Sequence, residues 1–296
     1  MRTAKPIPAE LRAWAEQRIG SAVDVRDVSH DRPASRVWAL ECSHGVRRYV
    51  KVSPSDTFFT RETRAYRHVV PALGQGRAPQ LIDSRAEDLA LLLTAVPGHP
   101  VPATNLSAAE QRAALLQAGT LLARLHQAGE IKGPDRIEAG TALGLAADGA
   151  EKHLARAGDR LTEPERQLVR DHADRLSRVG PVPVGFIHGD NQPRNWMWSR
   201  PIRQLALIDY ERTRPAALVQ DLVILAATEW LDHPDREHAF LQGYGRLLTD
   251  AERFALRCLI ALDAVNCLAW GPDHNDPEVT ARGRRSLDRL MRKDRP

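Results

Sequence analysis

Alternation of apolar and polar residues in the first third of the chain predicts a small β-sheet. Short runs rich in Val, Leu, Ile and Thr are separated by turn residues such as 43–45, which is the pattern of antiparallel strands. A helical pattern over 8–20, ended by Gly20, precedes the strands, and a second over 57–70 stops at Pro71. The predicted strands are 23–29, 35–42, 46–53, 80–84 and 89–94.

The rest of the chain has the longer period of helices. Pro97 and Gly98 interrupt the apolar run of the last predicted strand, and the pattern beyond them is helical. Ser107 and Thr249 each stand three residues before a glutamate, which is the spacing of a capping box. The predicted helices are 107–129, 140–156, 162–179, 215–231, 249–270 and 278–293. This order predicts an α+β protein with a strand-rich lobe over 1–95 and a larger helical lobe over 96–296.

Composition narrows the class of protein without indicating an activity. The chain has 296 residues, enough for one large domain or a two-lobed unit, and 43% of them are apolar and 27% charged. The net charge is +4, but the arginines are scattered among acids, so we expect no nucleic-acid partner.

The first residues predict a short helix rather than a signal peptide, and no uninterrupted apolar run approaches a membrane span. We therefore expect a cytoplasmic protein that does not bind membranes. Three cysteines without metal-site spacing, Cys42, Cys258 and Cys267, are expected to be reduced and mostly buried.

Candidate chemistry is concentrated between residues 186 and 211. His188-Gly189-Asp190 is followed by Asn195, and Asp209 stands fourteen positions later, a spacing that suits a short hairpin. A carboxylate such as Asp190 could take a proton from a substrate hydroxyl, while the oxygens of Asn195 and Asp209 are ligands that Mg²⁺ prefers. The alternative is that each residue only stabilises a local turn. Their joint spacing favours phosphoryl transfer over coincidental turns.

This stretch resembles the catalytic loop of the aminoglycoside phosphotransferase family, the small-molecule branch of the protein-kinase-like fold. In that family His-Gly-Asp leads to Asn and then to a strand end of the form Ile-Asp-Trp/Tyr-Glu, here residues 208–211. The resemblance implies a two-lobed fold with a small antiparallel sheet and one main helix in the N-terminal lobe. It implies that Asp190 is the catalytic base, that Asn195 and Asp209 bind Mg²⁺, that His188 supports the loop and that Glu211 helps near the metal.

A lysine inside an apolar strand is a second candidate. Lys51 ends the run Tyr49-Val50-Lys51-Val52, and Glu62 follows eleven positions later in the predicted helix 57–70. In kinase-like folds a strand lysine that binds the α and β phosphates is held by a helix carboxylate, and this pair resembles that arrangement. The alternatives are a solvent-facing edge lysine and a surface ion pair between Glu62 and the neighbouring Arg61 or Arg64.

The remaining nucleotide contacts follow from the resemblance alone. The first predicted hairpin, 29–35, contains no glycine, unlike the phosphate loop of protein kinases, and family members often use a serine instead. Ser35 is the candidate for that role. The connector after residue 94 resembles the family's hinge, where the adenine ring bonds the backbone, so Thr94 and Val96 are candidates for the base pocket. The alternative is a plain turn between lobes.

Candidates outside these motifs lie in the helical part. Asp221 stands among apolar residues and must be hydrogen-bonded if it is buried. An aspartate at this place in the family anchors the catalytic loop, so we expect Asp221 to be structural. The carboxy-terminal helices commonly line the family's acceptor cleft, although each candidate there could equally be a surface or core residue. The acceptor-site candidates are Glu229, Asp232, Asp263, Asn266 and Trp270.

The predicted function is transfer of a phosphoryl group from ATP or GTP, with Mg²⁺, to a hydroxyl of a small molecule. The acceptor expected first is an antibiotic, inactivated by phosphorylation. A polycationic aminoglycoside would favour an acidic cleft, whereas this chain is net basic, which favours an antibiotic of lower positive charge. The alternatives are a choline, amino-alcohol or sugar kinase and a nucleotide-binding protein without activity. The presence of Asp190, Asn195 and Asp209 argues against the last.

Overall fold

The computed structural model describes residues 5–29 and 36–293, and these form two compact units. Unit 1 comprises residues 1–129 and 193–214, and unit 2 comprises residues 130–192 and 215–296. The predicted lobe boundary between residues 95 and 96 falls inside unit 1. The chain therefore enters unit 1 twice, because the segment 193–214 packs with the N-terminal residues and not with its neighbours in sequence.

Unit 1 is built on an antiparallel five-stranded sheet in the order β1-β2-β3-β5-β4. All five predicted strands are confirmed, with bounds shifted by one or two residues. The strands are β1 (Ala22–Asp27), β2 (Arg36–Cys42), β3 (Arg47–Val52), β4 (Leu81–Arg85) and β5 (Ala90–Thr94). In the register of the sheet, Lys51 of β3 lies between Val37 of β2 and Leu91 of β5.

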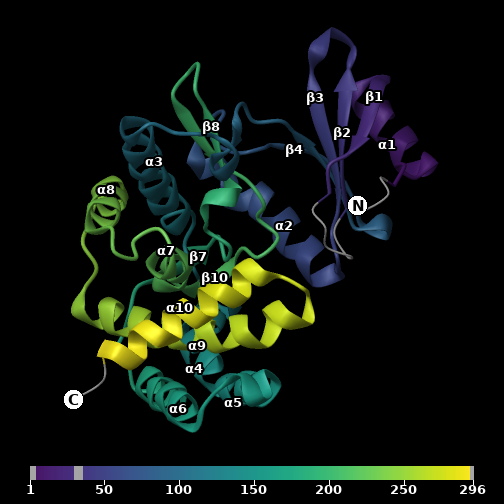
Figure 1. Cartoon of the computed structure of the whole chain (residues 1–296). Coiled ribbons are helices and arrows are strands. Elements are labelled where there is room, and N and C mark those ends of the chain that lie inside the picture. Colours follow the sequence, from purple (N-terminus) through teal and green to yellow (C-terminus); the bar gives the residue numbers. More distant parts are fainter. Residues whose placement is uncertain (1–4, 30–35, 294–296) are drawn as a thin grey trace. The chain divides into compact units, whose positions relative to one another are not determined.

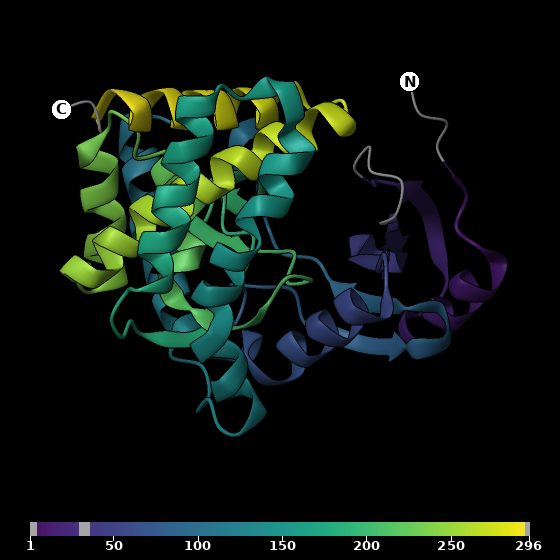
Figure 2. The same cartoon turned by 90° about the horizontal axis from the view of Figure 1, so that it is seen from below.

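Each face of this sheet is covered by one helix. Leu11 and Trp14 of α1 (Ala9–Ile19) pack with Trp38, Val50 and Leu92 in one apolar cluster, and both cartoon views show the purple α1 beside the first strands (Figures 1 and 2). Successive side chains of a strand point to opposite faces. Lys51 therefore points away from this cluster, toward α2 (Asp56–His68), whose Glu62 it contacts.

The rest of unit 1 attaches a second, three-stranded sheet to a long helix. Its strands are β6 (His99–Pro100), β8 (Trp196–Ser199) and β9 (Gln204–Leu207), in the order β6-β8-β9. The capping box predicted at Ser107 begins α3 (Ala108–His126), which packs on β9. Gly98 has a φ of 102°, and a Cβ there would lie 2.3 Å from the carbonyl oxygen of Trp198. The connector after β5 can therefore approach β8 only because residue 98 is glycine.

Unit 2 is mainly helical, and its central helix is α9 (Asp250–Asp273). By length and composition α9 could cross a membrane, but two thirds of its most apolar window is buried within the protein, as in the core helix of a globular unit. The helices packed on α9 are α4 (Pro134–Asp148), α5 (Ala150–Ala157), α6 (Glu163–Ser177), α7 (Val223–Ala227) and α10 (Pro277–Lys293). The unit also contains α8 (Pro234–Tyr244) and a two-stranded sheet of β7 (Val184–Ile187) and β10 (Arg214–Ala217).

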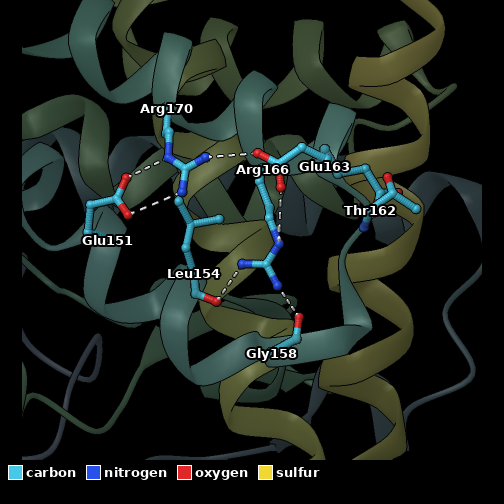
Figure 3. A network of polar contacts seen from close by, with 8 residues as sticks. Glu151, Leu154, Gly158, Thr162, Glu163, Arg166 and Arg170 are labelled. Carbon is cyan, nitrogen blue, oxygen red and sulfur yellow. Dashed lines mark hydrogen bonds and ion pairs between the residues drawn. The ribbon is translucent and has the colours of Figure 1, made fainter.

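Two arginines of α6 hold it against α5 and the turn that follows. The Arg170 guanidinium bonds Glu151 of α5 at 2.8 Å and Glu163 of its own helix at 3.2 Å. Arg166 donates to the carbonyl oxygens of Leu154 in α5 and of Gly158 directly after it (Figure 3). These contacts tie α6 to α5 and to the turn after it.

Three predictions for unit 2 are corrected. The apolar stretch 215–231 is not one helix: it begins with β10, continues as a 3₁₀ helix over Leu218–Leu222 and contains only the short α7. The predicted helix 140–156 is two helices, because the chain breaks at Gly149 between α4 and α5. The helix α8 was not predicted at all. The α+β architecture with a small antiparallel sheet and a mainly helical remainder is confirmed.

Candidate active site

Lys51 is the centre of a buried charge cluster in unit 1. Its ammonium lies 2.9 Å from Glu62 of α2, 2.6 Å from Asp209 and 3.1 Å from Glu211, and only 8% of its side chain is exposed. Glu62 is completely buried, so neither the edge lysine nor the surface ion pair describes these residues. A buried ammonium requires such partners, because removing a charge from water costs several kcal/mol.

The protonation behaviour of this cluster follows from three carboxylates around one cation. Burial lowers the pKa of Lys51, but Asp209, Glu62 and Glu211 together raise it well above its ordinary value, so the ammonium stays charged. Burial raises the pKa of Glu62 to about 7, and the charge of Asp209 adds to this effect while Lys51 opposes it. Glu62 thus titrates near neutral pH, although it contacts a lysine.

Asn195 and Asp209 flank the hairpin of β8 and β9, as their spacing predicted. The pairing of the two strands continues past their ends, where the N–H of Ile208 donates to the carbonyl oxygen of Asn195 at 3.0 Å. Asn195 ends the 3₁₀ helix Pro193–Asn195 and is buried, whereas the Asp209 side chain is 34% exposed. The hairpin therefore places the side-chain amide of Asn195 and the carboxylate of Asp209 at the same end of the two strands.

Asp209 has a left-handed backbone conformation, with a φ of 70°. This conformation is uncommon for a residue with a side chain and occurs where the surroundings impose it. The next residue, Tyr210, is fully buried; its hydroxyl donates to the carbonyl oxygen of Leu207, and its ring lies 5.4 Å from that of Tyr66 in an edge-to-face contact. Tyr210 fixes the strand end so that Asp209 and Glu211, on either side of it, both reach Lys51.

These ligand types fit a magnesium ion. No cluster of three or more His, Cys, Asp or Glu side chains able to hold a metal occurs within 5–29 and 36–293, so no all-protein metal cage exists there. Mg²⁺ typically takes only one or two carboxylate-type ligands from a protein and completes its shell with phosphates and water. The side chains of Asn195 and Asp209 supply oxygens of the required kind.

In unit 2, the loop 188–191 is held by Asp221. The Asp221 carboxylate accepts the N–H of His188 at 2.6 Å and that of Gly189 at 2.7 Å, and its carbonyl oxygen accepts the side-chain amide of Asn191. All of these groups except Gly189 are buried. Asp221 lies in the 3₁₀ helix Leu218–Leu222, which explains why this stretch is not a regular α-helix: its carboxylate must face the loop.

His188 and Asp190 belong to the same loop. The Asp190 N–H donates to Nδ1 of His188 at 3.3 Å, so this ring nitrogen acts as an acceptor. One oxygen of the Asp190 carboxylate accepts a hydrogen bond of 2.6 Å from the side chain of Gln192. The loop therefore fixes Asp190 through its backbone on one side and through its carboxylate on the other.

Three further residues were predicted to contact the nucleotide, namely Ser35, Thr94 and Val96. Ser35 lies outside the described residues. The N–H of Thr94 donates to the carbonyl oxygen of Gln80, and its hydroxyl accepts the N–H of Gln80, so Thr94 closes the pairing of β4 and β5. Val96 follows in the connector that leads to Gly98 and is half-buried.

The acceptor candidates form two groups in unit 2. Asp263, Asn266 and Trp270 are half-buried and, at spacings of three and four residues, share one face of α9. The Trp270 ring stacks on His274 with ring centroids 4.0 Å apart. Glu229 and Asp232 lie in the segment between α7 and α8. Each of the three acids among these candidates contacts an arginine.

Two residues of the candidate site were not identified from the sequence. Asn191 stands inside the recognised motif, but its bond to the carbonyl oxygen of Asp221 depends on a segment thirty residues later. Arg282 of α10 contacts Asp263, and no local pattern distinguishes it from the other arginines of that helix. The spacing Asp209-x-Glu211 was a usable signal for Glu211, since it lets both carboxylates reach one lysine across a single intervening residue.

Solved structures share this architecture. A thermostable aminoglycoside phosphotransferase APH(4)-Ia in complex with ADP and hygromycin B superposes with a TM-score of 0.69 at 12% identity, covering 97% of this chain and 100% of that one. The GDP and kanamycin complex of APH(2")-IIia gives 0.69 at 15% identity, with 97% and 100% covered. The macrolide 2'-phosphotransferase MphH from Brachybacterium faecium gives 0.59 at 14%, with 95% and 98% covered. At these identities the likeness shows the fold, which is the protein-kinase-like fold of small-molecule phosphotransferases.

The sequence itself gives the family. The model of the phosphotransferase enzyme family matches residues 24–257, which include both Lys51 and the loop that carries Asp190. No curated protein matches the chain. The chain belongs to the phosphotransferase enzyme family, and it is a phosphotransferase that acts on an alcohol group.

Proposed function

We propose that this protein uses Mg²⁺ and ATP or GTP to phosphorylate a hydroxyl group of a small molecule, with Asp190 as the catalytic base. The observation that carries the proposal is the buried Lys51, held by Glu62 and reaching Asp209 at 2.6 Å. A lysine fixed in this way can neutralise phosphate charge, and its contact with Asp209 ties it to the proposed metal ligand. Solved relatives of the same fold were crystallised with ADP and with GDP, which supports a nucleotide substrate.

In the proposed mechanism, unit 1 holds the nucleotide. Asn195 and Asp209 would hold Mg²⁺, which neutralises charge on the phosphates when it is bound. Lys51 would exchange part of its contact with Asp209 and Glu211 for phosphate oxygens, while Glu62, fully buried, keeps the ammonium in place. Thr94 and Val96 remain the candidates for the base contact.

Asp190 would orient the acceptor hydroxyl and take its proton. Gln192 already hydrogen-bonds one carboxylate oxygen, so the other is the one that faces the acceptor in this proposal. Asp221 would keep the loop in position by accepting two of its N–H groups, and His188 would support the loop through its contact with the Asp190 N–H. Most of the acceleration in such a reaction comes from positioning and electrostatics.

The acceptor we propose is an antibiotic, which phosphorylation would inactivate in the cytoplasm. Support comes from proteins of the same fold: two were solved in complexes with hygromycin B and with kanamycin, and a third is a macrolide 2'-phosphotransferase. A metabolite kinase acting on choline, an amino alcohol or a sugar is the second candidate. The net charge of +4 suits a polycationic aminoglycoside poorly, which favours an antibiotic of lower positive charge.

The test combines nucleotide binding with turnover. We expect MgATP or MgGTP to raise the melting temperature, because a ligand present at a hundred times its Kd adds about 2.7 kcal/mol to the stability of the native state. A panel of antibiotics and hydroxylated metabolites should then include a compound that gains a phosphate by mass spectrometry.

Two variants separate the roles. Asp190→Ala should retain nucleotide binding but lose at least roughly 100-fold in turnover, the range that a general base contributes. Lys51→Met should lose nucleotide binding as well. Normal turnover by Asp190→Ala would contradict its role as base, and a protein that binds nucleotide but phosphorylates nothing would favour the inactive alternative.

A further inference from the structure

Each acidic residue predicted to line the acceptor cleft is paired with an arginine of unit 2. Glu229 bonds Arg236 at 3.0 Å, Asp232 bonds Arg289 at 2.9 Å and Asp263 bonds Arg282 at 3.3 Å. Paired acids have little negative charge left to attract an ammonium group. These three carboxylates therefore do not form the acidic cleft that a polycationic acceptor would need.

The pair on α9 and α10 is the most buried of the three. The side chain of Arg282 is 14% exposed and that of Asp263 is 19% exposed, whereas the Asp232 side chain is 78% exposed. One guanidinium nitrogen of Arg282 also donates to the sulfur of Cys267 at 2.9 Å. Its Nε is buried without a hydrogen-bond partner among the described residues, so the guanidinium has unused donor capacity.

Close packing of the two helices fixes this arginine. Figure 1 shows α10 lying along α9, and the contact is made at Gly283, the residue after Arg282. A Cβ at position 283 would lie 2.7 Å from the carbonyl oxygen of Ala264. Arg282 is thus held against the α9 face that carries Asp263, Asn266 and Trp270.

Arg282 and the loop of the proposed base are both held against α9. Burial lowers the pKa of the Arg282 guanidinium, but Asp263, Cys267 and Asp190 raise it above its usual value. The 3₁₀ helix Leu218–Leu222, whose Asp221 holds the loop of Asp190, packs on the same helix α9 that carries Asp263. An acceptor whose hydroxyl lies at Asp190 would therefore meet Asp263 as a neutral pair with Arg282 and not as a free carboxylate.

We propose that Arg282 determines the charge class of the acceptor: it neutralises Asp263, so that no free carboxylate at this position holds an ammonium group, and the acceptor is neutral or anionic around the reacting hydroxyl. This inference rests on the proposed phosphotransfer at Asp190. It goes beyond that function because it names the residue that selects the acceptor and the kind of molecule selected.

The test compares acceptors that share hydroxyl groups but differ in charge. Suitable pairs are kanamycin and its fully N-acetylated derivative, glucosamine and N-acetylglucosamine, and choline and its uncharged isostere 3,3-dimethylbutan-1-ol. Nucleotide-dependent phosphorylation of each member is followed by mass spectrometry, and kcat/KM is measured wherever product forms. The wild-type enzyme should prefer the uncharged member of every pair that it phosphorylates.

Variants assign this preference to Arg282. Arg282→Gln exposes the charge of Asp263 and should shift the ratio of kcat/KM toward the cationic member by about tenfold, the scale of one partly buried charge pair. Adding Asp263→Asn removes both charges and should reverse most of that shift, which a mere packing defect would not do. Arg284→Gln is the matched control, because Arg284 lies two residues away and pairs instead with Glu165 and Asp288.

The outcomes distinguish this inference from the proposed function. A wild-type preference for the cationic members, or a ratio that Arg282→Gln leaves unchanged, overturns the inference while phosphotransfer stands. Nucleotide binding without turnover of any member of the pairs also contradicts the proposed acceptor class. Absence of nucleotide binding contradicts the proposed function itself.

Discussion

At the scale of single residues, the titration of Glu62 gives a measurable pH effect. Its pKa is about 7 in the folded protein, mainly through burial, against 4.5 for an ordinary glutamate. The folded state binds this proton more tightly, so the resulting stability is complete below pH 4.5 and is lost as pH rises through 7. The free energy of unfolding of the wild type, minus that of Glu62→Gln, should fall by roughly 1 to 3 kcal/mol between pH 4.5 and 7.5.

Urea denaturation at a series of pH values measures this difference. Glu163→Gln serves as a control, since the Glu163 side chain is 76% exposed and its substitution should give a difference that hardly depends on pH. A difference for Glu62→Gln that is flat across this range would show that Glu62 ionises normally.

A second residue-scale prediction concerns Asp221. Its carboxylate accepts two backbone N–H groups, from His188 and Gly189, while an asparagine has one oxygen and would turn an N–H₂ group toward the other donor. Asp221→Asn should therefore destabilise the protein by about 2 to 4 kcal/mol, because a buried N–H is left unpaired. Thermal unfolding measures this, and Asp174→Asn, on the exposed side of α6, should change little. Equal melting temperatures for the two variants would show that Asp221 does not hold the loop.

At the scale of elements, glycine sets the packing of α9 and α10. Gly283→Ala would press a methyl group against the backbone of Ala264 and the side chain of Cys267, so it should cost about 1 to 3 kcal/mol. Gly140→Ala in α4 meets no atom within 4 Å and should stabilise the helix by about 0.5 to 1 kcal/mol. Chemical denaturation of the two variants should thus give changes of opposite sign. The same sign for both would mean that the helices separate to accept the methyl group.

Helices and strands were predicted correctly where a local sequence pattern alone determined them. Period-two alternation placed all five strands of the sheet, and the capping boxes at Ser107 and Thr249 placed the starts of α3 and α9. The stretch 215–231 was misread because its apolar residues suit a helix, whereas pairing with β7 and the demands of Asp221 impose a strand and a 3₁₀ turn. These are long-range contacts, which a local pattern does not contain.

At the scale of the whole molecule, the candidate site was predictable as a set of residues but not as a set of contacts. The motif identified Asp190, Asn195 and Asp209, and the strand context identified Lys51. Nothing local showed that the chain would return at residue 193 to complete the unit that holds Lys51, or that Arg282 of α10 would pair with Asp263 of α9. Such relations depend on which distant segments pack together.

The return of the chain at residue 193 can be tested with fragments of unit 1. Leu207 donates its N–H to the carbonyl oxygen of Arg77 at 2.9 Å, the Arg77 guanidinium donates to Leu205, and Gln117 of α3 accepts the N–H of Leu205. A fragment of residues 1–129 lacks these partners and also lacks Asp209 and Glu211, so Lys51 keeps only Glu62.

We expect fragment 1–129 to unfold at a lower temperature than the same fragment joined by a flexible linker to residues 193–214. Circular dichroism measures both transitions, and a joined fragment carrying Arg77→Ala should fall between them, because it loses one guanidinium but keeps the hairpin. Equal stability of the two parent fragments would mean that the N-terminal sheet and helices need no hairpin. In that case the N-terminal part of unit 1 would be stable without residues 193–214. The role of these residues would then be to supply Asp209 and Glu211 to Lys51, and not to stabilise the fold.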